Sequence, residues 1–323
     1  MKKWELGSLL FKHREYNIVG HVRPDGDCIG SQLALHNVLK TNGIKCNIIQ
    51  NDNPGTILSA FLDDYPTVDV ENFNAKLPLI CVDCSDFKRA GQKILKQYDR
   101  PYLNLDHHIS NDNFAQHNIV DANSSSTAEL LAKSLIDGNI DFDRATAEAL
   151  YLGIMTDSNR FAYSTTLDTI KIVEILMGKG ISISKIYGRI YERDSLQKYH
   201  LLERFFHNIS IFGDGSYCTS FVTENDFRET LCEPLDTEGF VNYTRQIDGV
   251  KIGAFLEFHD SYLKCSLRSK NPNFRMDLFA KQFGGGGHPA AAGFTVTTNS
   301  KNFHENFKSA LIEHVKNLPG EKL

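Results

Sequence analysis

The stretch of sequence that decides the fold is Ile18-Val19-Gly20-His21-Val22-Arg23-Pro24-Asp25-Gly26-Asp27-Cys28-Ile29-Gly30-Ser31. It begins with apolar strand-forming residues and continues through an imidazole, His21, to two carboxylates, Asp25 and Asp27, which flank a glycine. This order predicts a buried strand whose end leads directly into a helix. Carboxylates held close together repel each other strongly. The stretch therefore predicts one part of a site for a divalent cation.

Three further apolar segments, two strand-like and one helical, carry side chains of the same kinds at their ends. These side chains are Asp83, Asp106, His107, His108 and Asp157. Any one of them alone is more typical of a turn or a helix cap than of a metal ligand. In an open parallel sheet, however, ligands gather beyond the carboxyl ends of the strands. Four such segments together predict that the side chains share one crevice.

The composition of this predicted cluster indicates the metal. About four carboxylates and two imidazoles are too many for one tetrahedral zinc ion and suit a site for two metal ions. Oxygen and nitrogen ligands without thiolate favour Mn²⁺ or Mg²⁺, with Fe or Co as alternatives. Cys81 and Cys84 form a C-x-x-C pair around Asp83, a spacing that is also found in redox and zinc sites. Because there is no second such pair, we interpret these thiols as small buried apolar groups.

A block of four glycines, residues 284–287, precedes His288 and a run of small apolar residues. Consecutive glycines disfavour helix and strand because each loses much conformational entropy on folding. Their bare N–H groups can approach an anion closely, so the block predicts phosphate binding, with a flexible linker as the alternative. Further upstream, residues 124–127 read Ser-Ser-Ser-Thr before a helical pattern. They predict a helix N-cap, with anion binding as the second interpretation.

The order of patterns along the 323 residues predicts two α/β domains. Strands are expected near 17–22, 45–49, 78–83 and 101–105, with a helix near 29–42, which indicates a parallel sheet. Helices follow near 167–176 and from 183 to about 206. Later segments predict strands near 250–258 and 262–267, and helices near 276–282 and 302–316. We expect a catalytic domain at 1–185, a helical connector at 186–212 and a smaller substrate-binding domain at 213–323, with the active site in the cleft between the domains.

Composition limits the partners and the compartment. A net charge of −5 and a pI of about 6.2 are unlike a protein that grips long duplexes through many phosphate contacts, so short substrates are favoured. The polar start of the chain and the lack of a long apolar run predict neither a secretory segment nor a membrane span. Seven cysteines then favour a reducing cytoplasm. The oligomeric state stays open, a homodimer being one alternative.

Taken together, the motifs resemble those of the DHH family of phosphoesterases. The first is His21-x₃-Asp25-x-Asp27, the second Val82-Asp83, the third Asp106-His107-His108 and the fourth Thr156-Asp157. The glycine block with His288 resembles the signature of the DHH-associated C-terminal domain. Where many members read Asp-Thr-Gly in the fourth motif, this chain reads Asp157-Ser158-Asn159. The pairing of both signatures in a chain of this length most resembles the NrnA-type branch of the family.

The resemblance implies a role for each motif residue. His21 and Asp25 are expected to hold one metal ion, Asp27, His107 and Asp157 the other, and Asp83 to bridge the two. Asp106 is expected to orient a ligating imidazole, and His108 to face the substrate phosphate. The candidates for phosphate binding are Arg160, Arg268 and His288 as charge-neutralising side chains, of which Arg268 lies in a segment that resembles the phosphate-contacting strand of the family. Gly285, Gly286 and Gly287 are candidates through their backbone N–H groups.

The resemblance also implies the activity, which is hydrolysis of short RNA or DNA oligonucleotides and removal of the 3′-phosphate from adenosine 3′,5′-bisphosphate. Two divalent cations are expected as cofactors, Mn²⁺ first and Mg²⁺ or Co²⁺ as alternatives. Other enzyme hypotheses keep this chemistry and change the substrate to the linear dinucleotide of cyclic-di-AMP turnover, to pyrophosphate or to polyphosphate. The hypothesis of another class is a nucleotide-sensing binding protein. The complete ligand set argues against it.

Overall fold

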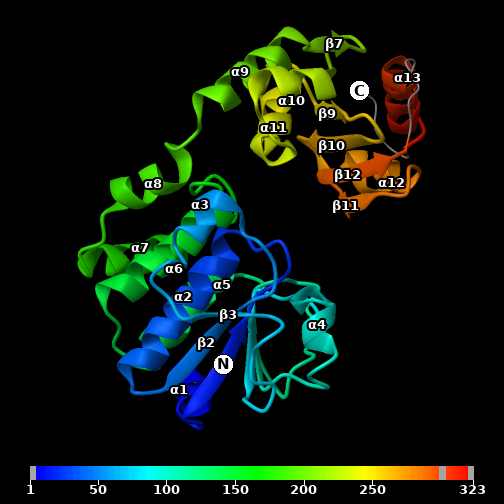
Figure 1. Cartoon of the computed structure of the whole chain (residues 1–323). Helices are drawn as coiled ribbons and strands as arrows, with labels where there is room; N and C mark the ends of the chain where they lie inside the picture. The colour runs from blue at the N-terminus through cyan, green and yellow to red at the C-terminus, as the bar shows by residue number, and fades with distance from the viewer. Residues whose placement is uncertain (1–4, 298–302, 319–323) are drawn as a thin grey trace. The chain divides into compact units, whose positions relative to one another are not determined.

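The computed structural model describes residues 5–297 and 303–318, and the chain divides into two compact units, Met1–Arg193 and Asp194–Leu323 (Figure 1). The division falls within the range predicted as a connector. The expected helix from 183 to about 206 is in fact two helices, α8 (Ile183–Tyr191) and α9 (Leu196–His207). Ile186 of α8 packs into the core of the first unit, whereas Phe205 of α9 packs into a core of the second.

The first unit is built on a parallel sheet of six strands in the order β3-β2-β1-β4-β5-β6. In chain order the strands are β1 (Glu15–Val19), β2 (Lys45–Gln50), β3 (Thr67–Asp69), β4 (Leu79–Val82), β5 (Leu103–Asp106) and β6 (His117–Val120). The expected parallel sheet is confirmed, and β3 and β6 are short edge strands that the sequence pattern did not predict. Ile18 of β1 pairs with Ile48 on one side and with Ile80 on the other, so apolar residues line up across the sheet.

Helices cover both faces of this sheet. Ile18 and Ile80 pack on one face in a core shared with α2 (Gly26–Thr41), α5 (Thr127–Asp137) and α6 (Arg144–Asp157), while Val19 and Cys81 face the opposite side. That side is covered by η1 (Phe87–Ala90) and α4 (Gln92–Leu95), and α4 is seen apart from α2 in Figure 1. The other helices are α1 (Glu5–Leu10), α3 (Gly55–Ser59) and α7 (Leu167–Gly178).

Two glycines allow α2 and α6 to pack closely. A Cβ atom on Gly30 would lie 2.5 Å from the carbonyl oxygen of Ala149, and a Cβ atom on Gly153 would lie 2.7 Å from Oδ1 of Asp27. Neither position has room for a larger side chain. The close contact therefore brings α6, with Asp157 at its C-terminal end, against the first turn of α2.

The second unit contains a mixed sheet in the order β11-β12-β10-β9-β8-β7, in which only β8 and β9 are parallel among the described strands. Its strands are β7 (Ser210–Phe212), β8 (Tyr217–Thr223), β9 (Ile252–Phe258), β10 (Leu263–Ser269), β11 (Gly286–His288) and β12 (Ala291–Val296). Its remaining helices are α10 (Glu224–Thr230), η2 (Pro234–Thr237), α11 (Phe240–Gln246), η3 (Pro272–Phe274), α12 (Met276–Lys281) and α13 (Phe303–Lys316). Residue 302 of the predicted last helix lies outside the described residues.

The two faces of the second sheet have separate cores. Leu267 of β10 packs with Phe279 of α12 and Phe307 of α13. Phe255 of β9 packs on the other face with residues of α9, α10 and α11. No described helix is long and apolar enough to cross a membrane.

Candidate metal centre and phosphate-binding surface

The predicted metal-binding residues of the first unit all lie at one edge of the parallel sheet. His21 follows β1, Asp83 follows β4, and His107 follows β5. Asp25 caps the N-terminus of α2, and Asp157 is the last residue of α6. The structure thus brings together ends of three strands and two helices, as expected from the position of each residue after an apolar segment.

The first group of candidate ligands is His21, Asp25 and Asp83. The Nε2 atom of His21 lies 3.7 Å from Oδ2 of Asp25 and 3.3 Å from Oδ2 of Asp83. The ligand atoms of the three residues all lie within 4.8 Å of one another. The other ring nitrogen, Nδ1, lies 2.9 Å from the carbonyl oxygen of Val22. This contact turns Nε2 towards the carboxylates, which is the usual arrangement of a metal-binding histidine.

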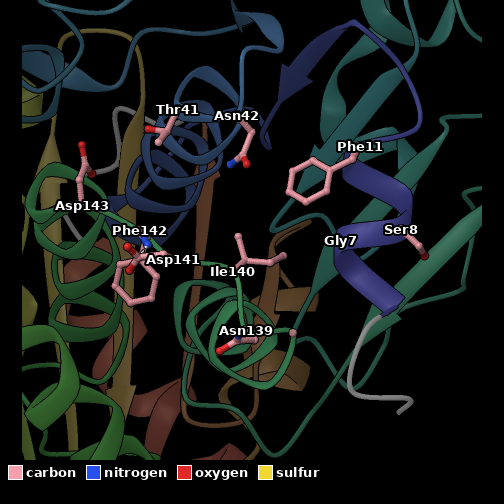
Figure 2. Close-up of a pocket in the computed structure, with 11 residues that line it drawn as sticks. Gly7, Ser8, Phe11, Thr41, Asn42, Asn139, Ile140, Asp141, Phe142 and Asp143 are labelled. Carbon is pink, nitrogen blue, oxygen red and sulfur yellow. Dashed lines mark hydrogen bonds between the residues drawn. The ribbon is translucent and has the colours of Figure 1, made fainter.

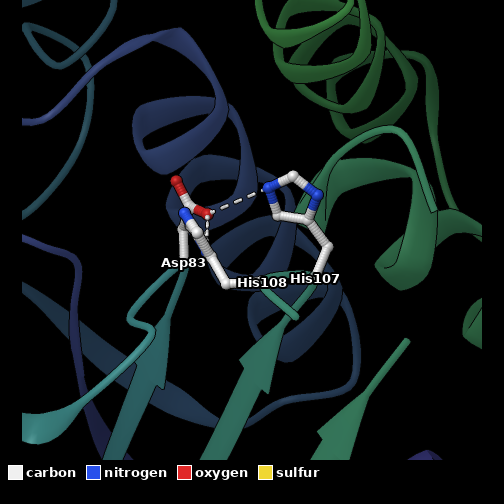
Figure 3. Close-up of side chains that lie close together, drawn as sticks. All are labelled: Asp83, His107 and His108. Carbon is white, nitrogen blue, oxygen red and sulfur yellow. Dashed lines mark ion pairs between the residues drawn. The ribbon is translucent and has the colours of Figure 1, made fainter. Parts of the chain in front are cut away.

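The second group of candidate ligands is Asp27, His107 and Asp157, whose ligand atoms also lie within 4.8 Å of one another. Nε2 of His107 lies 3.5 Å from Oδ2 of Asp157 and 3.8 Å from Oδ1 of Asp83. Figure 3 shows one oxygen of Asp83 facing the imidazoles of both His107 and His108. Asp83 therefore presents one carboxylate oxygen to each of the two groups.

Asp27 is buried and is held by the N-terminus of α5. Its Oδ2 accepts a hydrogen bond of 2.7 Å from the backbone N–H of Thr127, and its Oδ1 accepts one of 2.9 Å from that of Ala128. Ser126 caps the same helix by accepting from the N–H of Glu129, so the predicted N-cap is confirmed. The anion at this helix end is thus a carboxylate of the chain itself.

Thr127 is a residue of the site that sequence reasoning missed. While its N–H donates to Asp27, its hydroxyl donates to Oδ1 of Asp83 at 3.0 Å, and the side chain is fully buried. Asp83 itself has a φ of +58°, in the left-handed region that non-glycine residues rarely adopt, and its N–H bonds to the carbonyl of Leu105. The only sequence signal for Thr127 was its place in the Ser-Ser-Ser-Thr run.

Asp106 orients His108. The Nδ1 atom of His108 lies 2.7 Å from Oδ1 of Asp106. The other oxygen, Oδ2, accepts a hydrogen bond of 2.6 Å from the side-chain amide of Asn111. The hydrogen bond to Asp106 raises the pKa of His108. Asp106 was expected to orient a ligating imidazole, and the imidazole that it holds is that of His108, which forms a third group with Asp83 and His107 whose ligand atoms lie within 4.8 Å of one another. The Nδ1 atom of His107 lies 3.3 Å from the carbonyl oxygen of Ser124.

The charges of the cluster fit a cation. Burial, followed by repulsion from Asp83, Asp157 and Asp25, raises the pKa of Asp27. Burial also raises the pKa of Asp157 to about 6. Burial alone would lower the pKa of His21, but its hydrogen bonds to Asp25 and Asp83 raise it to about 10. Protons here offset the repulsion among carboxylates, and divalent cations bound by the same oxygen and nitrogen atoms would offset it more strongly.

The loop after Asp157 explains the departure in the fourth motif. Asn159, Arg160 and Phe161 have φ values of +47°, +61° and +65°. Asparagine is one of the non-glycine residues that best tolerates this region, so it suits the position that glycine occupies in the Asp-Thr-Gly form of the motif. The guanidinium of Arg160 lies 5.1 Å from the ring centroid of Tyr191 in α8. Arg160 thus has a packing partner within the first unit in addition to its predicted role.

The predicted phosphate-binding residues of the second unit share one sheet. Arg268 on β10 is paired with Ala291 on β12, and Ala291 is paired with His288 on β11. Laterally paired residues point to the same face, so Arg268 and His288 share a face. Arg268 is half-buried and His288 is exposed.

The glycine block does not avoid regular structure, contrary to expectation. Gly286 and Gly287 lie in the edge strand β11, paired with β12. A Cβ atom on Gly285 would lie 2.2 Å from the carbonyl oxygen of Gly293, and Gly287 has a φ of +139°. Packing against β12 and backbone conformation therefore account for part of the block, and the exposed Gly286, with open space beside it, remains accessible.

Cys81 and Cys84 are fully buried free thiols, as interpreted from the sequence, and burial raises the pKa of both.

A cavity of about 580 Å³ lies elsewhere in the first unit, between α1, the C-terminal end of α2 and the α5–α6 loop (Figure 2). Phe11, Asn42 and Ile140 are among its lining residues. No predicted site residue lines this cavity, so it is separate from the candidate metal centre.

Comparison with known proteins agrees with this geometry. Residues 15–154 match the DHH family, N-terminal domain, and residues 214–317 match the DHHA1 domain. The chain is 30% identical over 298 residues to the bifunctional oligoribonuclease and PAP phosphatase NrnA of Mycoplasma pneumoniae, covering 90% of both chains. It is 28% identical over 287 residues to the Bacillus subtilis protein of the same name, covering 85% of this chain and 87% of the relative.

A solved structure is also similar. The crystal structure of an exopolyphosphatase-related protein from Bacteroides fragilis superposes with a TM-score of 0.87 at 26% sequence identity, covering 97% of this chain and 96% of that one. The match to both domains, the similarity over nearly the whole length and the clustered motif residues agree with each other. The chain belongs to the DHH family of phosphoesterases, in the form that carries a C-terminal DHHA1 domain.

Proposed function

We propose that this protein hydrolyses short oligoribonucleotides to mononucleotides and removes the 3′-phosphate from adenosine 3′,5′-bisphosphate. The observation that carries the proposal is the pair of ligand groups that meet at Asp83. The relatives named as oligoribonuclease and PAP phosphatase, similar over 85–90% of this chain, support the choice of substrate.

Two divalent cations fit the site, and we propose Mn²⁺ because the donors are carboxylate oxygens and imidazole nitrogens. His21 and Asp25 would hold one ion, Asp27, His107 and Asp157 the other, and Asp83 both. When bound, such a pair supplies an activated water at neutral pH and neutralises charge on a phosphoryl group.

The other residues act on the substrate and on the ligands. His108, whose pKa is raised by its hydrogen bond to Asp106, would neutralise charge on a phosphoryl oxygen in its protonated form. Thr127 would keep Asp27 and Asp83 in their orientations. Arg160, Arg268, His288 and the glycines at 285–287 are proposed to bind the substrate phosphates. Free thiols at all seven cysteines support action in a reducing cytoplasm.

One substrate panel tests the proposed function. The protein, loaded with Mn²⁺, is incubated separately with adenosine 3′,5′-bisphosphate, labelled di- to pentaribonucleotides, a 30-base-pair duplex, the linear dinucleotide pApA, pyrophosphate and polyphosphate. We expect release of phosphate from the bisphosphate and of mononucleotides from the short oligomers, without attack on the duplex. Turnover of pyrophosphate or polyphosphate alone would contradict the proposed substrate, and tight nucleotide binding without turnover of any compound would support a sensing role instead.

A further inference from the structure

Asn51 lies directly after β2, at the edge of the parallel sheet where the candidate metal ligands gather. Because β2 pairs in parallel with β1, the end of β2 lies beside the loop that carries His21. The side chain of Asn51 is half-buried, and its amide donates two hydrogen bonds. Its Nδ2 atom lies 2.8 Å from the carbonyl oxygen of Gly20 and 3.0 Å from that of Ala90. Asn51 therefore joins the residue before His21 to the last residue of η1.

The two residues whose carbonyl oxygens accept from Asn51 are both buried. A Cβ atom on Gly20 would lie 2.0 Å from Sγ of Cys28, so the backbone of Gly20 packs directly against the first turn of α2. Without the amide of Asn51, both carbonyl groups would lose this donor, which costs free energy in a buried setting. The segments lower this cost when they move or admit water, and either change shifts Gly20.

The loop formed by residues 20–25 also depends on other contacts from outside it. Arg23 has a φ of +56°, in the left-handed region that is unfavourable for a non-glycine residue. Its N–H donates to Oδ2 of Asp52 at 2.9 Å, and the N–H of Val22 donates to the carbonyl oxygen of Arg89 at 2.8 Å. The residues after β2 and those of η1 thus hold the loop from two sides.

The two groups of candidate ligands are supported in different ways. Asp27, in the second group, accepts hydrogen bonds from two backbone N–H groups at the N-terminus of α5. His21, in the first group, lies between two peptide groups of the loop, and Asn51 bonds to the one that precedes it. The orientation of these peptide groups sets the direction of the His21 side chain. Loss of the Asn51 amide should therefore displace His21 and leave Asp27 in place.

We propose that Asn51 is a positioning residue for the metal ion of the first ligand group, and that it sets the affinity of this ion while the ion of the second group is held independently of it. This inference rests on the pair of metal ions in the proposed function. Residues that orient a metal ligand from behind typically contribute about 10- to 100-fold to metal affinity. Asn51 does so through the backbone of the loop, because its amide contacts the peptide group before His21.

Calorimetric titration of Mn²⁺ into the metal-free full-length chain tests the proposal. Wild type, Asn51→Ala, Asn51→Asp and Asn53→Ala are compared. Asn51→Asp keeps the shape of the side chain but removes the donor, and Asn53, an exposed amide that accepts from the N–H of Gly55, serves as the control. We expect both Asn51 variants to bind one ion within twofold of the wild-type affinity and the other at least tenfold more weakly, and Asn53→Ala to match the wild type. Wild-type affinity for both ions in Asn51→Asp, or equal weakening of both, would overturn the proposal.

A double-mutant cycle identifies the ion that is affected. His21→Ala removes a ligand of the first group, so Asn51→Ala should change Mn²⁺ affinity less than twofold in that background. A further tenfold loss there would overturn the proposal. Neither titration uses a substrate. Selective loss of one ion in a protein that hydrolyses no oligonucleotide would keep the role of Asn51 and contradict only the proposed function, whereas unchanged titrations in an active enzyme would overturn only the role of Asn51.

Discussion

The two units carry candidate site residues of opposite charge, and the surroundings of these residues differ. In the first unit, the buried carboxylates Asp27 and Asp83 lie close to the exposed carboxylates Asp25 and Asp157, and strand ends, helix ends and backbone N–H groups fix them. In the second unit, Arg268 and His288 stand on an open sheet face beside small residues. The first arrangement is preorganised for small cations, while the second leaves room for an anionic ligand of variable size. Changes in the first cluster should therefore affect every substrate, and changes on the second surface should affect some substrates more than others.

The largest expected effect is that of Asp83→Ala. Because Asp83 presents an oxygen to both ligand groups, we expect kcat to fall by roughly 10³-fold or more for every substrate, with little change in unfolding temperature. Steady-state assays and thermal unfolding measure the two quantities. Asp168→Ala removes an exposed carboxylate on α7 and serves as the control. Near-normal activity in Asp83→Ala would contradict the bridging role.

A smaller and more selective effect is expected from Arg268→Gln. Loss of a guanidinium that binds a substrate phosphate should raise KM by about 10- to 100-fold while kcat changes much less. Kinetics with adenosine 3′,5′-bisphosphate and with a pentaribonucleotide measure this change. A drop in kcat without a change in KM, equal for both substrates, would contradict a role of Arg268 in substrate binding.

The sequence was sufficient for the parts of the fold whose signals are local. The apolar run before His21, the helical pattern near 29–42 and the Ser-Ser-Ser-Thr run at 124–127 predicted β1, α2 and α5, whereas the capping of α2 by Asp25 is seen only in the structure. The edge strand β3, three residues long with two of them polar, has no such pattern, because its pairing with β2 defines it.

Prediction of the site residues was also restricted to residues that a local sequence pattern marks. The candidate metal ligands could be predicted because each follows an apolar segment. Thr127 could not, because its contact with Asp83 joins residues 44 positions apart. The resemblance to a family supplied residues at motif positions, whereas the position of Thr127 depends on tertiary contacts.

Thr127→Val tests how far the first cluster depends on its supporting hydrogen bonds. Valine keeps the shape and the N–H to Asp27 but removes the hydroxyl that donates to Asp83. We expect Mn²⁺ affinity to fall by roughly 10-fold, as is typical when a residue behind a metal ligand is lost. Isothermal titration of Mn²⁺ into the metal-free variant measures this, and Thr127→Ser should restore most of the affinity. Wild-type affinity in Thr127→Val would remove Thr127 from the site.

The smallest expected effect is a dependence of metal-induced stabilisation on pH. Burial raises the pKa of Asp157 from 3.8 to about 6, and hydrogen bonds to Asp25 and Asp83 outweigh burial to raise the pKa of His21 from 6.5 to about 10. Protonation of Asp157 stabilises the metal-free fold fully below pH 3.8, and this contribution is lost as the pH rises through 6. Protonation of His21 stabilises the metal-free fold fully below pH 6.5, and this contribution is lost as the pH rises through about 10.

Cations compete with these protons, so Mn²⁺ should raise the unfolding temperature more at pH 7.5 than at pH 5, by about 3 °C or more. The difference between metal-loaded and metal-free protein at each pH cancels the contributions of histidines elsewhere. An equal temperature shift at both pH values would contradict proton competition at this cluster.

The central claim is that one carboxylate joins two metal sites in the first unit. Anomalous diffraction at the manganese edge from crystals grown with Mn²⁺ tests it most directly. The account predicts two peaks, one beside His21 and Asp25 and one beside Asp27, His107 and Asp157, with Asp83 in contact with both. A single peak, or two peaks of which only one contacts Asp83, would contradict it.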